Sequence, residues 1–378
     1  MLKARKYFPL GKAGSEAFCN RKLEQEWLLK NIEAGKHSLI IAPRRYGKSS
    51  LAEIVIQKSK LPSQSMSFNS CSDEQEIVDL FSQRISRLIG LAIGPVEKWI
   101  DNIRKYLTHL TPQLIFGSEM VKLELKADPK KISLAMQLEE TLNLLEQLLA
   151  EKKQNAVLLL DEFQAIGLIA KGTGVEAAIR NAAQGMQYLS LVFSGSNRSL
   201  LLSMFEDDKR PLYKLCRKLK LERIEASEYQ KHINKAAKLA WGEVLPAAVF
   251  TQVMDYSERH PYYVNYLCDV IFTECDALPT IKDVQQAWNI VLSEEESAAC
   301  AEIANLSPVQ KKVLKMIAGQ SVEEIFSAKT IQELGIASSS LASGLGSLLE
   351  KDIVDREGES RYRVINPIIK CWIEPRLL

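Results

Sequence analysis

One segment of this 378-residue chain restricts its fold more than any other. Residues 42–50 read Ala-Pro-Arg-Arg-Tyr-Gly-Lys-Ser-Ser, and they follow the apolar run Ser38-Leu39-Ile40-Ile41. A Gly-Lys-Ser sequence between a buried strand and a helix is typical of a loop that binds phosphate groups. Such a loop surrounds phosphate oxygens with backbone N–H groups, and the following helix adds the positive end of its dipole. The segment therefore predicts an α/β fold with a nucleotide site.

The residue types within the loop support this interpretation. Lys48 is expected to bind the β and γ phosphates, and the Ser49 hydroxyl is expected to hold Mg²⁺. The motif usually begins with Gly, but Ala42 stands there, which requires a negative φ angle at this position. The predicted nucleotide contacts of the loop comprise Pro43, Arg44, Arg45, Tyr46, Gly47, Lys48, Ser49 and Ser50.

A second motif carries the acids that such a site needs. Val157-Leu158-Leu159-Leu160 is an apolar run suited to a buried parallel strand, and Asp161-Glu162 follows it directly. Asp161 at the end of the strand is expected to share the Mg²⁺ ion with Ser49. Glu162 is then placed to polarise an attacking water molecule. The alternative is that both acids are a solvated strand end.

Composition and charge exclude several other classes of protein. The net charge of +2 gives no global attraction to nucleic acid, and no apolar run approaches the roughly 20 residues that span a bilayer. The seven cysteines are odd in number and contain no C-x-x-C pair. This pattern favours reduced thiols over a disulfide framework or a zinc site. We therefore expect a cytoplasmic protein that does not contact membranes.

Strand and helix patterns alternate up to about residue 227. The strand candidates are His37–Ala42, Gln64–Asn69, Val157–Leu160, Leu189–Ser194 and Leu219–Ile224. Helical spacing fits between them over Lys48–Ser59, Asp73–Leu91, Ser133–Lys152 and Val175–Gln187. This alternation predicts a doubly wound parallel sheet in a core domain of residues 1–227. Residues 94–131 form an insertion, for which the alternatives are a lid or partner-binding role and a packing excursion.

Strand patterns stop after the core. Apolar residues recur at helical spacing from Gln230 to Glu296, so residues 228–304 are expected to form a helical lid. In residues 305–378, helices are predicted at Val309–Ala318, Ala328–Leu334 and Ser338–Glu350, followed by strands Ile353–Arg356 and Arg361–Val364 around a turn at Gly358-Glu359. Three helices and a two-stranded wing predict a winged helix.

Several of these motifs together resemble a known group. Arg44-Arg45-Tyr46-Gly47-Lys48-Ser49, Asp161-Glu162-Phe163-Gln164, Phe193-Ser194-Gly195-Ser196 and Arg210-Pro211-Leu212-Tyr213 occur in this order, and His260-Pro261-Tyr262-Tyr263 and Ile365-Asn366-Pro367 follow them. The chain resembles the archaeal-type ATPases, which are STAND-like members of the AAA+ superfamily. The resemblance implies an ASCE P-loop NTPase core with strand order 5-1-4-3-2, a helical lid and a carboxyl-terminal winged helix.

The resemblance also implies further site residues. The sensor at the end of the fourth strand would be Ser194 or Ser196, with Asn197 as another polar candidate that could equally cap the next turn. Arg210 and Arg217 are candidates for stabilising γ-phosphate charge in cis or from a neighbouring subunit, or they are surface cations. Arg21 and Pro261 are expected near the nucleotide, although Pro261 could simply start a helix. Arg44 and Arg45 either touch nucleotide oxygens or bind an acidic partner domain.

The sequence departs from the family pattern at four positions. Ala42 and Asn20 each stand where Gly is usual, and Arg259 precedes His260-Pro261 where relatives often carry Gly. Asn366 replaces a common Asp. None of these changes removes Lys48, Ser49, Asp161 or Glu162, so hydrolysis remains the expectation.

Three functions follow from these observations. The first is an ATP- and Mg²⁺-dependent switch, whose nucleotide state controls docking of the lid and winged helix to a protein partner or to a second copy. The second is a DNA-binding ATPase or regulator. Residues 305–378 carry ten Lys plus Arg against nine Asp plus Glu, and the expected recognition helix from Ser338 has no basic residue, which argues against DNA. The third is a scaffold that binds ATP without hydrolysing it.

Overall fold

The computed structural model describes residues 6–14, 16–116, 121–128, 131–169, 174–319, 325–357 and 361–373. The chain divides into two compact units. One, here the sheet unit, contains Lys22–Ala42 and Leu51–Leu221. The other, here the carboxyl-terminal unit, contains Met1–Arg21, Pro43–Ser50 and Glu222–Leu378.

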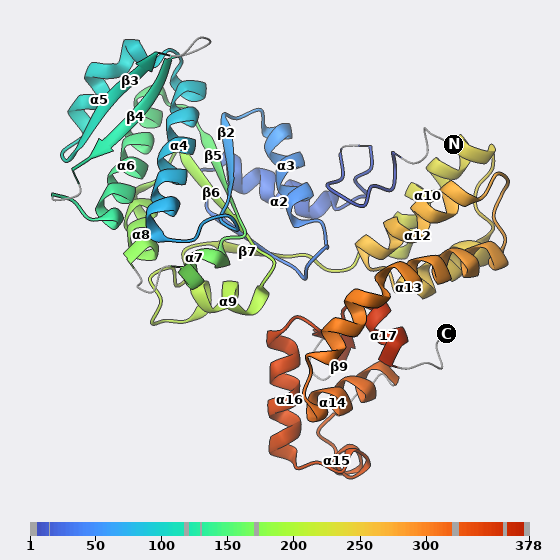
Figure 1. Cartoon of the computed structure of the whole chain (residues 1–378). Coiled ribbons are helices and arrows are strands. Elements are labelled where there is room, and N and C mark those ends of the chain that lie inside the picture. Colours follow the sequence, from blue (N-terminus) through green and yellow to red (C-terminus); the bar gives the residue numbers. More distant parts are fainter. Residues whose placement is uncertain are drawn as a thin grey trace. The chain divides into compact units, whose positions relative to one another are not determined.

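A five-stranded sheet forms the centre of the sheet unit (Figure 1). Its strands are β1 (Ser38–Ile41), β2 (Ser63–Ser67), β5 (Ala156–Asp161), β6 (Leu189–Ser194) and β7 (Arg217–Lys220). They lie in the order β2-β5-β6-β1-β7, and each neighbouring pair is parallel. Counting these strands alone, this is the predicted order 5-1-4-3-2 read from the other edge, so the α/β fold class is confirmed.

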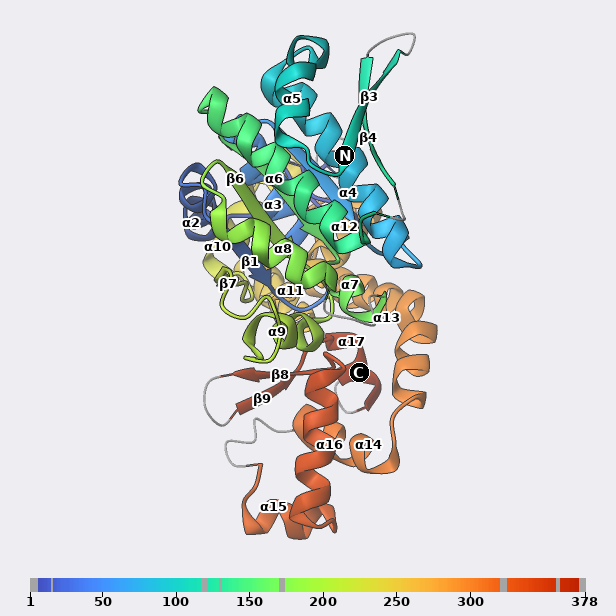
Figure 2. The same cartoon turned by 90° about the vertical axis from the view of Figure 1, so that its left-hand side faces the viewer.

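Burial explains why these particular residues form the sheet. Every residue of β1 and β6 is buried, as is every residue of β5 before Asp161. Helices α4 (Glu74–Ile93), α6 (Leu134–Lys152) and α8 (Gly174–Gly185) cover one face of the sheet, and α2 (Lys22–Glu33) and α3 (Lys48–Ser59) cover the other (Figure 1, Figure 2). A sheet covered on both faces needs nearly continuous apolar strands, which is the pattern observed.

The insertion between α4 and α6 contains more structure than expected. It begins with the 3₁₀ turn η1 (Val96–Trp99) and helix α5 (Ile100–Tyr106). Strand β4 (Val121–Ala127) pairs antiparallel with β3 (Leu110–Phe116). The sequence did not indicate β3, because Pro112 interrupts the strand pattern. Proline is tolerated there because a strand of a two-stranded ribbon needs to pair on one side only. Two short helices, α7 (Gln164–Ile169) and α9 (Arg198–Glu206), follow β5 and β6.

Four helices make up the lid part of the carboxyl-terminal unit: α10 (Ala226–Trp241), α11 (Ala247–Ser257), α12 (Pro261–Glu274) and α13 (Ile281–Ala304). A capping box of Thr280 and Asp283 starts α13, which runs on beyond the predicted Glu296. The amino-terminal segment packs on this part of the unit, with the Phe8 and Phe272 rings 5.0 Å apart.

A winged helix follows the lid. It consists of α14 (Pro308–Gly319), α15 (Ala328–Leu334), α16 (Ser338–Glu350), the hairpin β8 (Val354–Glu357) with β9 (Arg361–Val364), and α17 (Pro367–Ile373). The predicted bounds of α15, α16 and β9 agree with the structure, whereas α17 was not predicted as a helix. The predicted turn at Gly358-Glu359 lies outside the described residues. Buried residues of lid and winged helix belong to one continuous apolar core.

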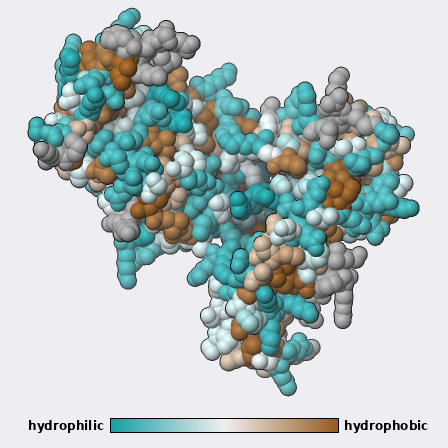
Figure 3. Space-filling model, viewed as in Figure 1, coloured by the Kyte–Doolittle hydropathy of each residue, from teal (hydrophilic) through white to brown (hydrophobic). Residues whose placement is uncertain are grey.

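The compact units do not coincide with the predicted domain boundaries. The amino-terminal residues as far as Arg21 group with the carboxyl-terminal half of the chain and not with the sheet. The three-domain division at residues 227 and 304 therefore stays a prediction. In the view of Figure 3, hydrophilic residues spread over the surface and hydrophobic ones form small separate groups. Within the described ranges, no helix is long and apolar enough to cross a bilayer.

Candidate functional site

The carboxyl ends of β5 and β6 bring Asp161 and Ser194 together. The Ser194 hydroxyl donates a hydrogen bond of 2.6 Å to Asp161 Oδ1, and the backbone N–H of Glu162 donates to the same oxygen at 3.1 Å. Both strands are parallel and adjacent, so their ends meet at one edge of the sheet. Strand β1 lies on the other side of β6 and ends at the same edge, which is where the chain leads into the phosphate-binding loop.

Glu162 is held by its neighbours in a fixed position. Its Oε2 accepts hydrogen bonds from Gln164 Nε2 at 2.6 Å, from Ser196 Oγ at 2.7 Å and from the Ser196 backbone N–H at 3.1 Å. Its φ angle is 52°, in the left-handed region that costs a residue other than glycine on the order of 1 kcal/mol or more. Three donors to one carboxylate oxygen stabilise this conformation, so the side chain has one defined direction.

Gly195 lets Gln164 reach this carboxylate. A Cβ atom at Gly195 would lie 1.9 Å from Gln164 Oε1, far closer than the 3.0 Å below which Cβ atoms make essentially no non-bonded contacts. Any larger residue would therefore displace the amide that donates to Glu162. Gln164 Oε1 is itself buried and has no hydrogen-bond partner in the described part of the chain. The Gly-Ser sequence after β6 thus has a steric reason.

The structure separates the sensor candidates. Ser194 bonds Asp161 and Ser196 bonds Glu162, so each acid has its own serine. Asn197 is the N-cap of α9, and its side chain accepts from the Leu200 N–H at 3.0 Å. Of the two roles considered for Asn197, the structure shows the capping role.

The two candidate arginines lie in different places. Arg210 forms a bidentate ion pair with Glu176 of α8, whose side chain is only 2% exposed. Burial raises the pKa of the Glu176 carboxyl, and the charge of Arg210 acts in the opposite direction. Such a pairing is typical of a structural contact, and the phosphate role of Arg210 stays a prediction.

Arg217 lies at the opposite end of the sheet from Asp161. It is the first residue of β7 and pairs with Ser38, the first residue of β1, so it is at the amino edge of the parallel strands. Its guanidinium donates to Asn31 Oδ1 at 3.2 Å and lies 5.5 Å from the Trp27 ring. Three residue steps of strand, about 10 Å, separate it from Lys220 at the carboxyl edge, which argues against a contact in cis with a nucleotide there. Its role in a neighbouring subunit remains a prediction.

The phosphate-binding loop has the backbone geometry that its sequence requires. Gly47 has a φ angle of 85°, and no heavy atom lies within 4 Å of where its Cβ would be. Arg45 also has a positive φ angle, of 66°, whereas Ala42 is absent from the described residues with positive φ. The Lys48 ammonium donates to the Pro43 carbonyl at 2.9 Å, so the loop closes around it. Ala42 is therefore compatible with the loop.

Two other predicted binding residues make structural contacts. The Ser50 hydroxyl accepts from the Ala13 N–H at 3.1 Å. Arg21, which is buried and has a φ angle of 58°, donates to the carbonyls of Tyr46 at 3.2 Å and Glu222 at 3.0 Å. Asn20 has a φ angle of 52°, which explains why relatives carry Gly there and why Asn is tolerated. Arg21 thus joins the loop to the start of the connection into the lid.

Arg45 extends from the loop toward the lid helices. Its guanidinium lies 4.1 Å from the centre of the Tyr262 ring and 3.4 Å from Glu295 Oε2 on α13. Of the two roles considered for this arginine, the structure shows contact with an acidic group of the lid. Arg44 is exposed.

Arg223 joins the loop, the lid and the winged helix. Its side chain is 4% exposed, and its Nε donates to the Tyr46 hydroxyl at 3.2 Å. Its two other nitrogens donate to the Glu258 carboxylate at 3.1 Å and to the Ile365 carbonyl at 3.0 Å. Glu258 also pairs with Lys370 of α17. Burial works to raise the pKa of Glu258, but Lys370 and Arg223 outweigh burial and lower that pKa.

His260 and Pro261 lie beside the loop. Pro261 is the first residue of α12, and the buried His260 ring meets the Tyr46 ring edge-on at 4.9 Å. Burial, with the charges of Arg223 and Arg45, holds the pKa of His260 well below its usual value. The imidazole is therefore neutral near pH 7. Pro261 acts as a helix start in this structure, and its contact with a nucleotide stays a prediction.

The residues present suit a magnesium nucleotide. The Lys48 ammonium donates to the Pro43 carbonyl of the loop itself, and an anionic phosphate would compete with that carbonyl for the ammonium. Asp161 in the sheet unit and Ser49 in the carboxyl-terminal unit each carry oxygen atoms, the ligand type that Mg²⁺ prefers. In the described ranges no group of three or more His, Cys, Asp or Glu is placed to hold a metal ion. The shared Mg²⁺ site of these two residues stays a prediction.

Sequence reasoning missed the residues that link separate elements. Arg223 and Glu258 have no motif around them, and the partners of Arg223 lie 35 to 177 positions away in the sequence. Gln164 was part of a quoted motif but was given no role. A signal existed for Gln164 alone, because it follows Glu162 by two residues at a strand end.

Comparisons with known proteins agree with this architecture. Residues 301–375 match the family model of a probable winged helix domain. Among solved structures, the chain resembles a Walker-type ATPase of Pyrococcus abyssi, with 16% identity, a TM-score of 0.69 and coverage of 97% of this chain and 99% of that chain. It also resembles the ORC2 protein of Aeropyrum pernix in ADPNP–ADP complexes, with 14% identity, a TM-score of 0.56 and coverage of 95% of each chain. No curated protein matches the sequence.

These likenesses extend over almost the whole chain, so they describe both units and not an isolated motif. Together with the parallel sheet and the winged helix, they establish the architecture. The chain has a fold like that of the Walker-type ATPase of Pyrococcus abyssi, and its residues 301–375 match a probable winged helix domain.

Proposed function

We propose that the protein is an ATP-hydrolysing switch whose nucleotide state controls the lid and the winged helix. Lys48 binds the β and γ phosphates, and Ser49 and Asp161 hold Mg²⁺. Glu162 polarises the attacking water, while Ser194 and Ser196 orient the two acids. Support for these roles comes from the hydrogen bonds of Ser194 to Asp161 and of Ser196 to Glu162.

One observation supports the switch in particular. Arg223 contacts a phosphate-loop residue, the end of α11 and the end of β9 at the same time. A buried arginine with partners on three elements transmits a shift of any one of them, because losing a partner leaves a buried charge unsatisfied. Movement of Tyr46 would therefore reposition the lid and the winged helix together.

Arg45 provides a second connection. A phosphate held by the loop competes for its guanidinium with Glu295 and the Tyr262 ring. Release of α12 and α13 from Arg45 is then linked to nucleotide binding, since one guanidinium does not serve both at full strength. The proposed output is docking of the lid and winged helix to a protein partner or to a second copy of this chain.

The test is ATP hydrolysis by the purified chain, compared with Glu162→Gln and Lys48→Ala. We expect a slow basal rate that falls at least about 100-fold in Glu162→Gln with ATP still bound, because a general base contributes that order of acceleration. Lys48→Ala is expected to lose binding itself. Duplex DNA should leave the rate unchanged. Binding without hydrolysis in the wild type, even with candidate partners present, would favour the scaffold and contradict the proposal.

A DNA-dependent ATPase is the alternative, and the winged helix fold is the observation that favours it. Two features count against it. Helix α16 contains no basic residue, and wing residues Arg361 and Arg363 line a cavity within the carboxyl-terminal unit. Affinity for DNA depends mainly on Lys and Arg contacts to phosphates. Strong stimulation of hydrolysis by duplex DNA would nevertheless replace the switch with this function.

A further inference from the structure

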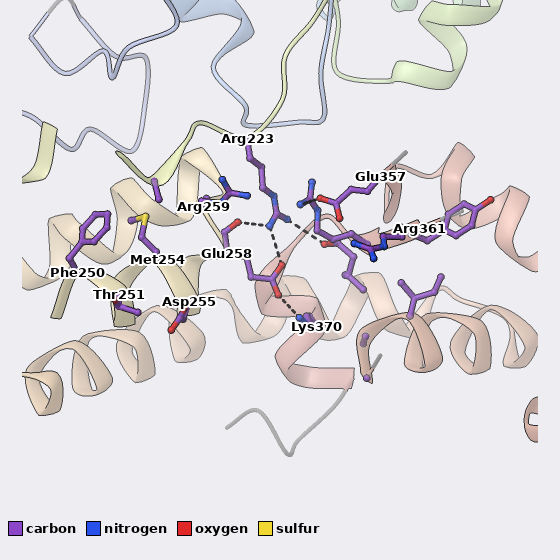
Figure 4. A pocket seen from close by; sticks show the side chains of 17 residues that line it. Arg223, Phe250, Thr251, Met254, Asp255, Glu258, Arg259, Glu357, Arg361 and Lys370 are labelled. Atoms are coloured by element: carbon purple, nitrogen blue, oxygen red, sulfur yellow. Dashed lines mark hydrogen bonds and ion pairs between the residues drawn. The ribbon is translucent and has the colours of Figure 1, made fainter. Parts of the chain in front are cut away.

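A large cavity lies within the carboxyl-terminal unit, between the lid and the winged helix (Figure 4). Its volume is about 740 Å³, within the range of roughly 300 to 1,000 Å³ typical of small-molecule sites. The connection before α10, the end of α11, the end of α14, the wing hairpin and α17 all contribute to its walls. None of the roles proposed above uses this space.

Positive charge predominates in the walls. Five cations line the cavity against three carboxylates: Arg223, Arg259, Arg361, Arg363 and Lys370 against Asp255, Glu258 and Glu357. Two of the three carboxylates are already engaged, Glu258 with Arg223 and Lys370, and Glu357 with Arg363. Among the described lining residues, positive charges therefore exceed negative ones by two, and one of the five cations, Arg259, also pairs with Glu225 outside the lining. Charge in a partly enclosed space attracts anions more strongly than on an open surface.

Arg363 shows that the polar groups of the cavity are not all satisfied internally. Its Nε is buried and has no hydrogen-bond partner among the described residues. Its Nη1 pairs with Glu357 on the neighbouring strand. A buried donor without an acceptor costs about 1 to 3 kcal/mol, and an acceptor brought by a ligand would remove that cost.

The opposite wall is apolar. Figure 4 shows Phe250 and Met254 of α11 on one side of the cavity, and Arg361 and Glu357 of the wing on the other. Ile317 and Ala318 at the end of α14 add further apolar surface. A bare inorganic anion would leave this wall unused, whereas a molecule with an anionic end and a planar or apolar body would contact both walls.

We propose that this cavity binds a small phosphorylated organic molecule of about the size of a mononucleotide. Its phosphate lies among Arg361, Arg259 and the Arg363 Nε, and its organic part lies against Phe250 and Met254. Such a ligand contacts lid and winged helix at once, so it stabilises their packing. The consequence for regulation rests on the proposed switch, but the binding itself does not.

Titration calorimetry with AMP and with inorganic phosphate tests this site. The full-length Lys48→Ala chain is the background, because it suppresses binding at the phosphate loop. Arg361→Gln and Arg259→Asn are the variants; Asn suits the φ angle of 59° at Arg259. Arg356→Gln on the same wing, outside the cavity lining, is the matched control. Circular dichroism checks that each variant is folded.

We expect one AMP molecule to bind with a dissociation constant below 1 mM, which corresponds to about 4 kcal/mol. Each cavity variant should weaken it at least tenfold, and the control by less than twofold. Absence of binding, or equal loss in the control, would overturn the site. Inorganic phosphate binding as tightly as AMP would refute an organic ligand.

A DNA duplex that binds through both Arg361 and Arg356 would instead assign the wing to nucleic acid. ATP hydrolysis in the Lys48-containing chain is measured separately, so failure of the switch and failure of this site are distinguishable.

Discussion

The two acids that we propose for catalysis are held by side chains at the ends of two neighbouring strands. Glu162 receives its hydrogen bonds from Gln164 and Ser196, and Asp161 receives one from Ser194. Gln164 contacts the Glu162 carboxylate, so under this proposal it is a positioning residue. Its packing against Gly195 leaves the amide little freedom. A general base held in one direction needs less reorganisation during reaction.

Replacing Gln164 by Ala should therefore lower kcat and leave binding of ATP nearly intact. We expect a fall in kcat of about 10- to 100-fold, because a misplaced base loses part of its contribution, with KM changed less than threefold. Steady-state kinetics over a range of ATP concentrations measure both quantities. Ser203→Ala on α9, whose exposed hydroxyl bonds only the Leu200 carbonyl in the described chain, is the control. An increase in KM with kcat unchanged would mean that Gln164 acts in binding.

At the scale of elements, Arg223 adds polar contacts to the apolar core that the lid and the winged helix share. It lies in the connection after β7, and its partners are the end of α11 and the end of β9. Glu258 has a φ angle of 46° and Arg259 one of 59°, so the chain turns sharply after α11 and brings this carboxylate to Arg223. Two left-handed residues in succession, neither of them glycine, are stable there because the ion pair holds the turn.

Arg223→Ala should therefore weaken the carboxyl-terminal unit and uncouple the winged helix from nucleotide. Removing one partner of a buried pair costs about 3 kcal/mol, which urea unfolding of the full chain measures. In this variant, limited proteolysis should cleave the winged helix in the same pattern whether ATP or ADP is present.

Lys218→Ala, which breaks the exposed pair of Lys218 with Glu206, is the control and should change stability by less than about 1 kcal/mol. If Arg223→Ala kept the nucleotide-dependent cleavage pattern, coupling would have to pass through another contact such as Arg45 and Glu295.

At the scale of the whole molecule, the buried His260 and the half-buried His37 and His232 link stability to pH in both units. Burial lowers the pKa of His37 in the sheet unit, and of His232 and His260 in the carboxyl-terminal unit. Each folded pKa therefore lies below the unfolded value of 6.5. As the pH falls below 6.5 the unfolded chain binds protons that the folded chain does not, so the free energy of unfolding decreases.

We expect the wild type to lose stability steadily from pH 6.5 to pH 5, and His260→Gln to lose it less steeply, by about one proton taken up on unfolding. Urea unfolding at intervals of half a pH unit measures the slope. At pH 8 the imidazole is neutral in both the folded and the unfolded chain. The difference in free energy of unfolding between His260→Gln and the wild type should therefore be independent of pH there. An unchanged slope in His260→Gln would show that this imidazole is protonated in the folded chain.

Local chemistry explains which features were predictable from the sequence. The loop around Lys48, the strand end at Asp161 and the helix from Ser338 depend on residue types at short spacing, because caps, turns and buried strands are formed by neighbours. Helix α15 has the predicted bounds, and the structure shows that Ser327 caps it and that the left-handed Gly335 ends it. The strand order came with the resemblance, which carries a whole topology that periodicity does not contain.

Register and long-range contact decided the rest. Arg217 was a plausible phosphate contact until the pairing of β7 with β1 placed it at the far end of the sheet. Nothing in the sequence pointed to Glu258 or Lys370, and only the fold shows that Glu258 pairs with both Arg223 and Lys370. By itself, the sequence determined the phosphate-binding loop, the acid pair and the fold class. Only the tertiary structure decided which charged groups meet, because a partner 100 residues away leaves no trace in local spacing and is selected by packing of the complete core.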